Sequence, residues 1–356
     1  MDVADFDFDL PQDLIAQEPA PAREAARLLC LWAETGAIEH SHISALPQHL
    51  RAGDLVVVND TRVFPARLLG HREPSGGAVE CLLVARVEDA THVSMPEEQV
   101  WEALVHPGQK LKPGARVIFD GERALHGEIL ERRYFGRRLV RLWTERGDSI
   151  DEAVDAIGHV PLPPYIKRGD RPDDRERYQT MFAAERGSIA APTAGLHFTP
   201  PLVQTLVEKG IELVRITLHV GLGTFQPVRV ERVEDHRMAS ERYLISEAAA
   251  DSVNRALDSG RRVIAVGTTT TRTLEAAAIQ GEGRVRAGAG STEVFIYPGF
   301  RFQIVQGLLT NFHLPRSSLL MLVAAFAGRE RVLSAYSEAI AHRYRFYSYG
   351  DAMLVL

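Results

Sequence analysis

The chain has 356 residues, of which 45% are hydrophobic and 25% are charged, and its formal net charge is −6. The length suits two domains of ordinary size, and the composition excludes a disordered tail, a collagen-like fibre and a coiled coil. The negative charge argues against a protein that binds nucleic acid mainly through a broad basic face.

Predicted strands and helices alternate at the two ends of the chain. The first strand, residues 53–60, is an apolar run that starts at a glycine and ends at Asn59 and Asp60. Further along we expect helix 202–209, strand 212–220, helix 248–257, strand 263–266, helix 272–278, strand 304–310 and helix 317–327. This alternation predicts an α/β domain with a largely parallel sheet covered by helices.

Residues 64–155 follow a different pattern. Short alternating runs, among them 79–84, 116–119 and 138–142, are separated by Pro-Gly and Asp-Gly turn signals. Closely spaced short strands are typical of a small antiparallel barrel or sandwich. We therefore expect a discontinuous α/β catalytic domain, residues 1–63 and 156–356, interrupted by a β-barrel domain at 64–155.

The sequence also predicts a compartment. The longest apolar run, residues 319–327, has nine residues, whereas a membrane-spanning helix needs roughly 18. The acidic N-terminus lacks the basic start of a signal peptide, and Cys30 and Cys81 have neither metal-ligand spacing nor a disulfide pattern. We therefore expect a cytoplasmic protein that does not bind membranes.

Four consecutive threonines follow Gly267, between the predicted strand 263–266 and the predicted helix 272–278. Backbone N–H groups at a helix N-terminus attract anions, and threonine hydroxyls add donors. One cap needs a single threonine, so Thr268, Thr269 and Thr270 predict a ligand-binding loop. The alternative is an ordinary helix cap in a βα loop.

Three histidines lie among small and constrained residues at predicted strand ends: His197, His219 and His313. Ligand sites in α/β folds gather at the carboxyl ends of strands, and histidine transfers protons near neutral pH. A structural role is the alternative for each histidine alone. Neither their spacing nor a nearby carboxylate supports a metal site, so we predict no metal ligands.

Arginines are concentrated at residues 132–146, which contain six of them. The planar guanidinium suits phosphate, but a solvated strand face in a hairpin is the interpretation that the pattern alone favours.

Several short motifs, taken in their order along the chain, resemble those of a known protein family. The segments are 59–63, 159–166, 174–180, 267–270, 272–275, 295–299 and 349–353, together with the three histidine segments. With them the chain resembles the S-adenosylmethionine:tRNA ribosyltransferase-isomerases of queuosine biosynthesis from Phe8 to the C-terminus. It departs from the family pattern at Ala239 and Gln306, where the family has histidine and usually aspartate, so no role is transferred to those positions.

The resemblance implies a barrel-like α/β domain with an inserted β-barrel. It also implies that the ribosyl group of S-adenosylmethionine moves to the 7-aminomethyl group of a 7-deazaguanine at the wobble position of tRNA. The product would be epoxyqueuosine, with adenine and methionine released. S-adenosylmethionine is then a co-substrate, and we expect no metal or redox cofactor because the electron flow stays within the substrate. The expected partner is a tRNA anticodon stem-loop, bound by a monomer.

Site residues follow from the resemblance and from the chemistry. His197, His219 and His313 would transfer protons, and Asp60 would orient a histidine or the ribose hydroxyls. The remaining predicted substrate-binding residues are Thr193, Gly195, Thr268, Thr269, Thr270, Asn311 and Arg62. The predicted tRNA-binding residues are Arg132, Arg133, Arg137, Arg138, Lys167 and Arg168. The aromatic residues that could stack a splayed base are Tyr165, Phe198, Phe225 and Phe312.

Two other classes of function stay open at this stage. One is a small-molecule transferase that uses S-adenosylmethionine or a phosphoribosyl donor without RNA. The other is a non-catalytic RNA-binding module, which three histidines at strand ends and the lack of a continuous basic face disfavour.

Overall fold

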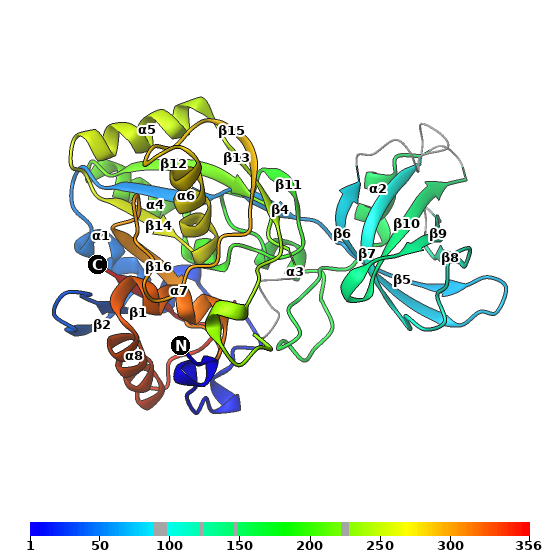
Figure 1. Cartoon of the computed structure of the whole chain (residues 1–356), viewed down its shortest axis with the longest axis horizontal. Coiled ribbons are helices and arrows are strands. Elements are labelled where there is room, and N and C mark those ends of the chain that lie inside the picture. The colour runs from blue at the N-terminus through cyan, green and yellow to red at the C-terminus, as the bar shows by residue number, and fades with distance from the viewer. Residues whose placement is uncertain (88–97, 122–123, 146–147, 222–227) are drawn as a thin grey trace. The chain divides into compact units, whose positions relative to one another are not determined.

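The computed structural model describes residues 1–87, 98–121, 124–145, 148–221 and 228–356 (Figure 1). The chain divides into a main unit, residues 1–62, 163–168 and 177–356, and a barrel unit, residues 63–162 and 169–176. The sequence predicted a catalytic domain formed by residues 1–63 and 156–356 and a β-barrel domain formed by residues 64–155. These domain boundaries stay a prediction. No helix among the described residues is long and apolar enough to cross a membrane.

A nine-stranded sheet forms the centre of the main unit, in the order β15-β13-β12-β3-β14-β16-β17-β1-β2. The strands are β1 (Arg27–Leu31), β2 (Ile38–His42), β3 (Leu55–Asn59), β12 (Glu212–Leu218), β13 (Glu241–Ile245), β14 (Val263–Val266), β15 (Gly288–Thr292), β16 (Gly307–Asn311) and β17 (Ala352–Val355). The central pairs β12–β3, β3–β14 and β14–β16 are parallel, but the pairs toward both edges are mostly antiparallel. The expectation of a largely parallel sheet therefore holds for the central strands and for the pair β1–β17, but not for the other pairs.

Helices cover both faces of this sheet. The helices of the main unit are α1 (Leu46–His49), α4 (Pro200–Glu208), α5 (Glu247–Asp258), α6 (Thr268–Gln280), α7 (Ser318–Ala327) and α8 (Arg329–Ala341). The residues of the short helix α3 (Asp174–Arg177) are divided between the two units. Alternate residues of a strand face opposite sides, so Leu55 and Val57 pack with α5 and α6, whereas Val56 and Val58 pack with α1 and α4. Strands β1 and β17 pack against α7 and α8 on the same face as α5 and α6.

The barrel unit contains a closed six-stranded barrel whose neighbouring strands are antiparallel (Figure 1). Its strands are β5 (Arg67–Arg72), β6 (Ala78–Val87), β7 (Gln99–His106), β8 (Arg116–Phe119), β9 (Leu125–Arg132) and β10 (Arg137–Thr144), followed by helix α2 (Ile150–Ile157). A two-stranded ribbon, β4 (Thr61–Val63) with β11 (Glu185–Ser188), completes the strands. The predicted fold class, α/β with an inserted antiparallel barrel, is confirmed.

Helix α6 differs from its prediction. The sequence predicted a loop of threonines before a helix at 272–278, but all four threonines lie in the first turn of α6, with Gly267 as the N-cap at φ 91°. The hydroxyls of Thr270 and Thr271 donate to the carbonyls of Val266 and Gly267, at 2.7 and 3.1 Å. These bonds satisfy the hydroxyls within the helix, so β-branched residues are accommodated there.

Candidate active site

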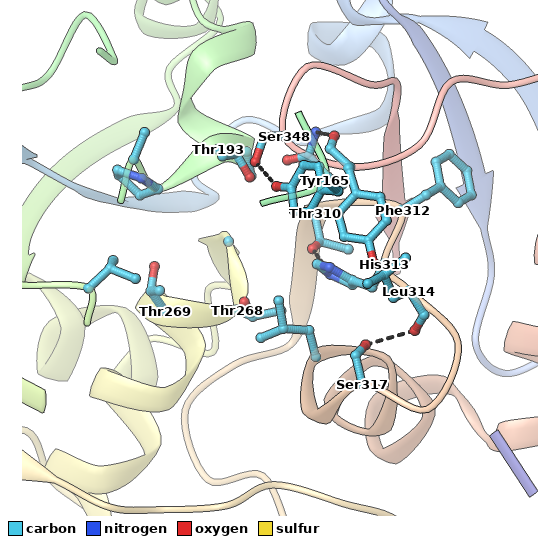
Figure 2. Close-up of a pocket in the computed structure, with 18 of the residues that line it drawn as sticks. Tyr165, Thr193, Thr268, Thr269, Thr310, Phe312, His313, Leu314, Ser317 and Ser348 are labelled. Carbon is cyan, nitrogen blue, oxygen red and sulfur yellow. Dashed lines mark hydrogen bonds between the residues drawn. The ribbon is translucent and has the colours of Figure 1, made fainter. Parts of the chain in front are cut away.

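A pocket lies where the parallel strands β14 and β16 end (Figure 2). It encloses about 810 Å³, including the part that is open to solvent. The start of α6, the loop after β16, residues 191–194 and residues 347–348 all contribute to its lining. Five predicted site residues line it: Thr193, Thr268, Thr269, Asn311 and His313. The carboxyl ends of parallel strands are the usual place for a ligand in an α/β sheet.

His313 follows β16 and is 7% exposed. Its Nε2 is 2.8 Å from Thr310 Oγ1, and its backbone N–H donates to the Tyr336 hydroxyl at 3.0 Å. Burial lowers the pKa of the imidazole to about 3, so it is neutral at pH 7. His313 can therefore exchange hydrogen bonds with a ligand, but it does not carry a positive charge into the pocket.

Asn311 connects a second predicted histidine to the pocket. Its Nδ2 group donates to His197 Nε2 at 3.2 Å and to the carbonyls of Tyr347 and Asp351 at 3.2 and 3.4 Å. His197 lies in the 3₁₀ helix Thr193–His197 and lines a separate hollow beside Arg23. Burial lowers the pKa of His197 to about 4. The geometry makes His197 a neutral acceptor that holds the Asn311 amide.

Three polar side-chain atoms around the pocket have no hydrogen-bond partner among the described residues. They are Thr269 Oγ1, Asn311 Oδ1 and Tyr347 Oη, in side chains that are 6%, 2% and 9% exposed. All three residues line the pocket. Buried polar groups in folded proteins are nearly always paired, so these atoms point to a ligand that supplies the partners.

The threonines of α6 divide between two roles. Figure 2 shows Thr268 and Thr269 on the first turn of α6 and His313 on the loop after β16, on two sides of the pocket. Thr270 is fully buried, and its hydroxyl is used by the Val266 carbonyl. Gly267 supplies no side-chain cap, so the first backbone N–H groups of α6 are left for a ligand.

His219 follows β12, next to Val220 of the pocket lining. Its Nδ1 is 2.8 Å from Thr61 Oγ1, and its pKa is lowered, mainly by burial. Asp60 has a different partner: its carboxylate accepts from the Thr217 hydroxyl at 2.7 Å, and burial raises its pKa. The residue that orients a histidine is therefore Thr61, which the sequence did not single out.

The other predicted substrate-binding residues lie outside the pocket lining. Gly195 belongs to the turn of His197, and a Cβ there would lie 3.0 Å from Thr180 Cγ2, so this glycine permits close packing. Arg62 is exposed on β4. Among the predicted stacking residues, Tyr165 and Phe312 line the pocket, although Phe312 is also fully buried in the core. Phe198 is fully buried in the core away from the pocket lining, and Phe225 lies outside the described residues.

Tyr347 and Ser348 are pocket residues that the sequence did not identify. The Tyr347 ring lies 4.0 Å from the Tyr165 ring, centroid to centroid, and the Ser348 hydroxyl is hydrogen-bonded to that of Tyr165. The available signal was the aromatic-rich stretch 346–349, which overlaps the start of the 349–353 motif.

The predicted tRNA-binding arginines lie on the β9–β10 hairpin of the barrel unit. Arg133 and Arg137 pair with Glu131 and Glu102, at 3.2 and 2.8 Å. Arg138 is 7% exposed and donates to three backbone carbonyls, of Gly136, Arg137 and Gly108. Arg132 is exposed and forms no ion pair with another described residue.

Lys167 and Arg168 belong to the main unit. Lys167 is exposed, whereas Arg168 bonds to the Gln17 carbonyl and to the Glu18 carboxylate, at 3.2 and 3.0 Å. The predicted histidines are not part of any three-residue group with metal-ligand geometry in the part of the chain that is described.

Comparisons with known proteins agree with the resemblance. The family model described as "Queuosine biosynthesis protein" matches residues 3–355. Proteins named "S-adenosylmethionine:tRNA ribosyltransferase-isomerase" from Desulfitobacterium hafniense and Heliobacterium modesticaldum are each 52% identical over 356 residues, 100% of both chains. The crystal structure of S-adenosylmethionine tRNA ribosyltransferase from Thermotoga maritima is similar at 37% identity and a TM-score of 0.55, with 99% of this chain and 100% of that chain covered.

Proposed function

The chain belongs to the queuosine biosynthesis protein family, and we propose that the pocket at the ends of β14 and β16 binds the S-adenosylmethionine of that family's reaction. The enzyme transfers and isomerises the ribosyl group of S-adenosylmethionine, and its second substrate is tRNA. The acceptor in this proposal is the 7-aminomethyl group of a 7-deazaguanine at the tRNA wobble position. Epoxyqueuosine forms there, and adenine and methionine leave.

The observation that supports this assignment most strongly is the set of three buried, unpartnered polar atoms. Leaving a buried polar atom unpaired costs about 1–3 kcal/mol. A nucleoside carries both donors and acceptors, so it can pair all three. Asn311 Oδ1 can only accept, which makes it a partner for the adenine amino group or a ribose hydroxyl. The hydroxyls of Tyr347 and Thr269 can donate or accept and suit the ring nitrogens or ribose oxygens.

The N-terminus of α6 suits the other end of the same molecule. Helix N-termini carry partial positive charge and exposed N–H donors. The 13-residue helix α6 begins at the pocket, and its glycine cap leaves those donors open. We place the methionine carboxylate of S-adenosylmethionine there, beside Thr268 and Thr269.

The reaction places three requirements on protons and hydrogen-bond donors. A base removes a proton from the ribose 5′ carbon, which the sulfonium makes acidic; a hydrogen-bond donor assists the departure of adenine; and the attacking amine must be neutral. Burial lowers the pKa of all three histidines, to about 4 in His197 and about 3 in His313, so those two stay uncharged and are poor bases; His219 is only half-buried. We therefore assign proton transfer to His219, ligand hydrogen bonding to His313, and positioning of Asn311 to His197. Asp60, with a raised pKa, is the alternative base.

The tRNA is bound as an anticodon stem-loop whose wobble base is splayed out, because a stacked base is inaccessible. In this proposal the β9–β10 hairpin contacts tRNA phosphate through Arg132, and the protein acts as a cytoplasmic monomer. Electron flow stays within the substrates, so the reaction itself uses no metal or redox cofactor.

The decisive experiment incubates the protein with S-adenosylmethionine and tRNA that carries the aminomethyl-deazaguanine. Mass analysis of the digested nucleosides should reveal a ribosyl adduct, and adenine should appear in equal amount. Adenine release with the free base but not with tRNA would instead indicate a small-molecule transferase.

A further inference from the structure

Two histidines and a glutamate converge on the surface of the main unit, outside the pocket lining. His40 lies on the edge strand β2, Glu338 lies in the last turns of α8, and His342 is the C-cap of that helix. His40 Nε2 is 3.4 Å from Glu338 Oε1, and His342 Nε2 is 3.0 Å from the same oxygen. One potential ligand atom from each residue lies within 4.8 Å of those of the other two.

From this geometry we infer a binding site for a divalent transition metal, specifically Zn²⁺, formed by His40, Glu338 and His342. Ligand atoms at about 2.0–2.1 Å from a tetrahedral zinc ion are about 3.3–3.4 Å from one another. The two distances to Glu338 Oε1, 3.0 and 3.4 Å, bracket that separation closely. Two imidazoles and one carboxylate are a common zinc ligand set, and water completes the fourth position.

A second contact orients one of the ligands. His40 Nδ1 is 2.8 Å from the hydroxyl of Tyr344, which is almost fully buried. When Nδ1 donates to this oxygen, the lone pair of Nε2 faces Glu338 and is available for the metal. Metal-binding histidines usually have such a partner on the other ring nitrogen, which fixes the ring and its tautomer.

The electrostatics of the cluster also favour a cation. The imidazole rings of His40 and His342 are 4.4 Å apart, centroid to centroid, so they repel one another if both are protonated. A single metal ion would bind both neutral rings and neutralise Glu338. The C-terminal end of α8 adds partial negative charge at His342.

The consequence of zinc binding would be a crosslink between the sheet edge and α8. β2 pairs only with β1 among the described strands, and its other edge is open. The metal would join β2 to the helix that precedes the pocket segment 347–348. Zinc should therefore raise the melting temperature without entering the reaction.

Zinc titration of the full, tag-free chain tests this inference. After chelator treatment and dialysis, calorimetry should detect one Zn²⁺ per chain, and Co²⁺ should give the intense visible bands of a tetrahedral site. His342→Ala and Glu338→Gln should each weaken Zn²⁺ binding by at least about tenfold, and Tyr344→Phe by about tenfold. The matched control is His42→Ala, because His42 is exposed on the same strand and outside the cluster.

Each outcome bears directly on the site. A melting temperature that rises with zinc in the parent and in His42→Ala, but not in His342→Ala or Glu338→Gln, supports it. No stoichiometric uptake by the parent, or equal affinity in the parent and both cluster variants, overturns it. Two variants at different positions keep the test valid if one folds poorly, and the result does not depend on ribosyl transfer.

Discussion

Asn311 illustrates how the scaffold prepares a side chain for a ligand. Three acceptors, on His197, Tyr347 and Asp351, surround its Nδ2 group and fix the amide plane. The Asp351 carboxylate is itself held by the backbone N–H groups of Arg27 and Arg345, at 2.9 and 2.8 Å. Because its donors are occupied, the amide presents only its oxygen to the pocket. A ligand must therefore supply a hydrogen-bond donor at this position.

Replacing Tyr347 with phenylalanine tests the role of one unpartnered atom. The hydroxyl has no partner among the described residues, so its removal should leave the melting temperature unchanged or slightly higher. Affinity for S-adenosylmethionine should fall by about 5- to 20-fold if the ligand uses this oxygen, as calorimetry can measure.

Tyr336→Phe is the matched control, because the Tyr336 hydroxyl accepts the backbone N–H of His313 at 3.0 Å. Its loss leaves a buried N–H unpaired and should lower the melting temperature. If Tyr347→Phe lowers the melting temperature as much and leaves the affinity unchanged, Tyr347 serves the fold and not the ligand.

The buried histidines predict how stability depends on pH. The pKa of His313 falls from its ordinary 6.5 to about 3 on folding. Above pH 6.5 the histidine is neutral in both the folded and the unfolded chain, so it does not reduce the free energy of unfolding. Below pH 6.5 the unfolded chain binds a proton at this histidine, whereas the folded chain does not. The free energy of unfolding should then fall by about 1.4 kcal/mol per pH unit for each such histidine.

His313→Gln should accordingly flatten the dependence of the melting temperature on pH between 6 and 4.5, relative to the parent. The control is His42→Gln, because His42 is exposed on β2. Parallel curves for the parent and His313→Gln would mean that His313 is not held neutral by burial.

The short buried strands could be predicted from sequence because their apolar runs are local and bounded by turn residues. Strand β14 was predicted with its observed bounds, and α5 and α7 to within one residue at each end. The start of α6 was missed because threonine disfavours helices in isolation, whereas here α6 is buried and its hydroxyls bond to the preceding turn. Local propensity could not anticipate that burial.

Binding of tRNA by the β9–β10 hairpin is best tested at single residues, because most of its predicted tRNA-binding arginines already have partners within the protein. Tyr134 at the turn is 88% exposed, and Arg132, two residues earlier in the chain, is exposed and forms no ion pair with another described residue. An exposed aromatic ring with an adjacent arginine suits an RNA base and its phosphate. Arg132→Ala should weaken tRNA binding and reduce its salt slope by about one unit, and Tyr134→Ala should weaken it with little change in slope.

Arg116→Ala is the matched control for charge, since Arg116 is exposed on β8 of the same barrel. Arg138→Ala should instead lower the melting temperature, because its guanidinium bonds to three carbonyls of the barrel unit. Equal tRNA affinity for the parent, Arg132→Ala and Arg116→Ala at several salt concentrations would show that this hairpin is only a solvated surface.

Across the whole chain, features that depend on local sequence could be predicted better than the pairing of strands that are distant in the chain. The inserted barrel followed from closely spaced turns. The histidine and threonine motifs predicted a ligand site at strand ends, and of those residues His313, Thr268 and Thr269 line the pocket. The antiparallel pairs of the main sheet could not be predicted, because pairs such as β16–β17 join residues that are 41 to 47 positions apart in the chain. For the same reason Tyr347 and Thr61 were missed, since they become site residues only through neighbours distant in the chain.

Chelation separates the proposed reaction from the inferred zinc site. The pocket lining shares no residue with His40, Glu338 and His342, and the proposed chemistry moves electrons only within the substrates. A zinc-selective chelator should therefore leave turnover at 25 °C within about twofold, while Mg²⁺ stays present to keep the tRNA folded. The same treatment should lower the melting temperature of the zinc-loaded parent but not of His342→Ala. Loss of turnover that added zinc restores would place a metal in the reaction and contradict this assignment; a parallel loss in His342→Ala would locate that metal away from the His40 cluster.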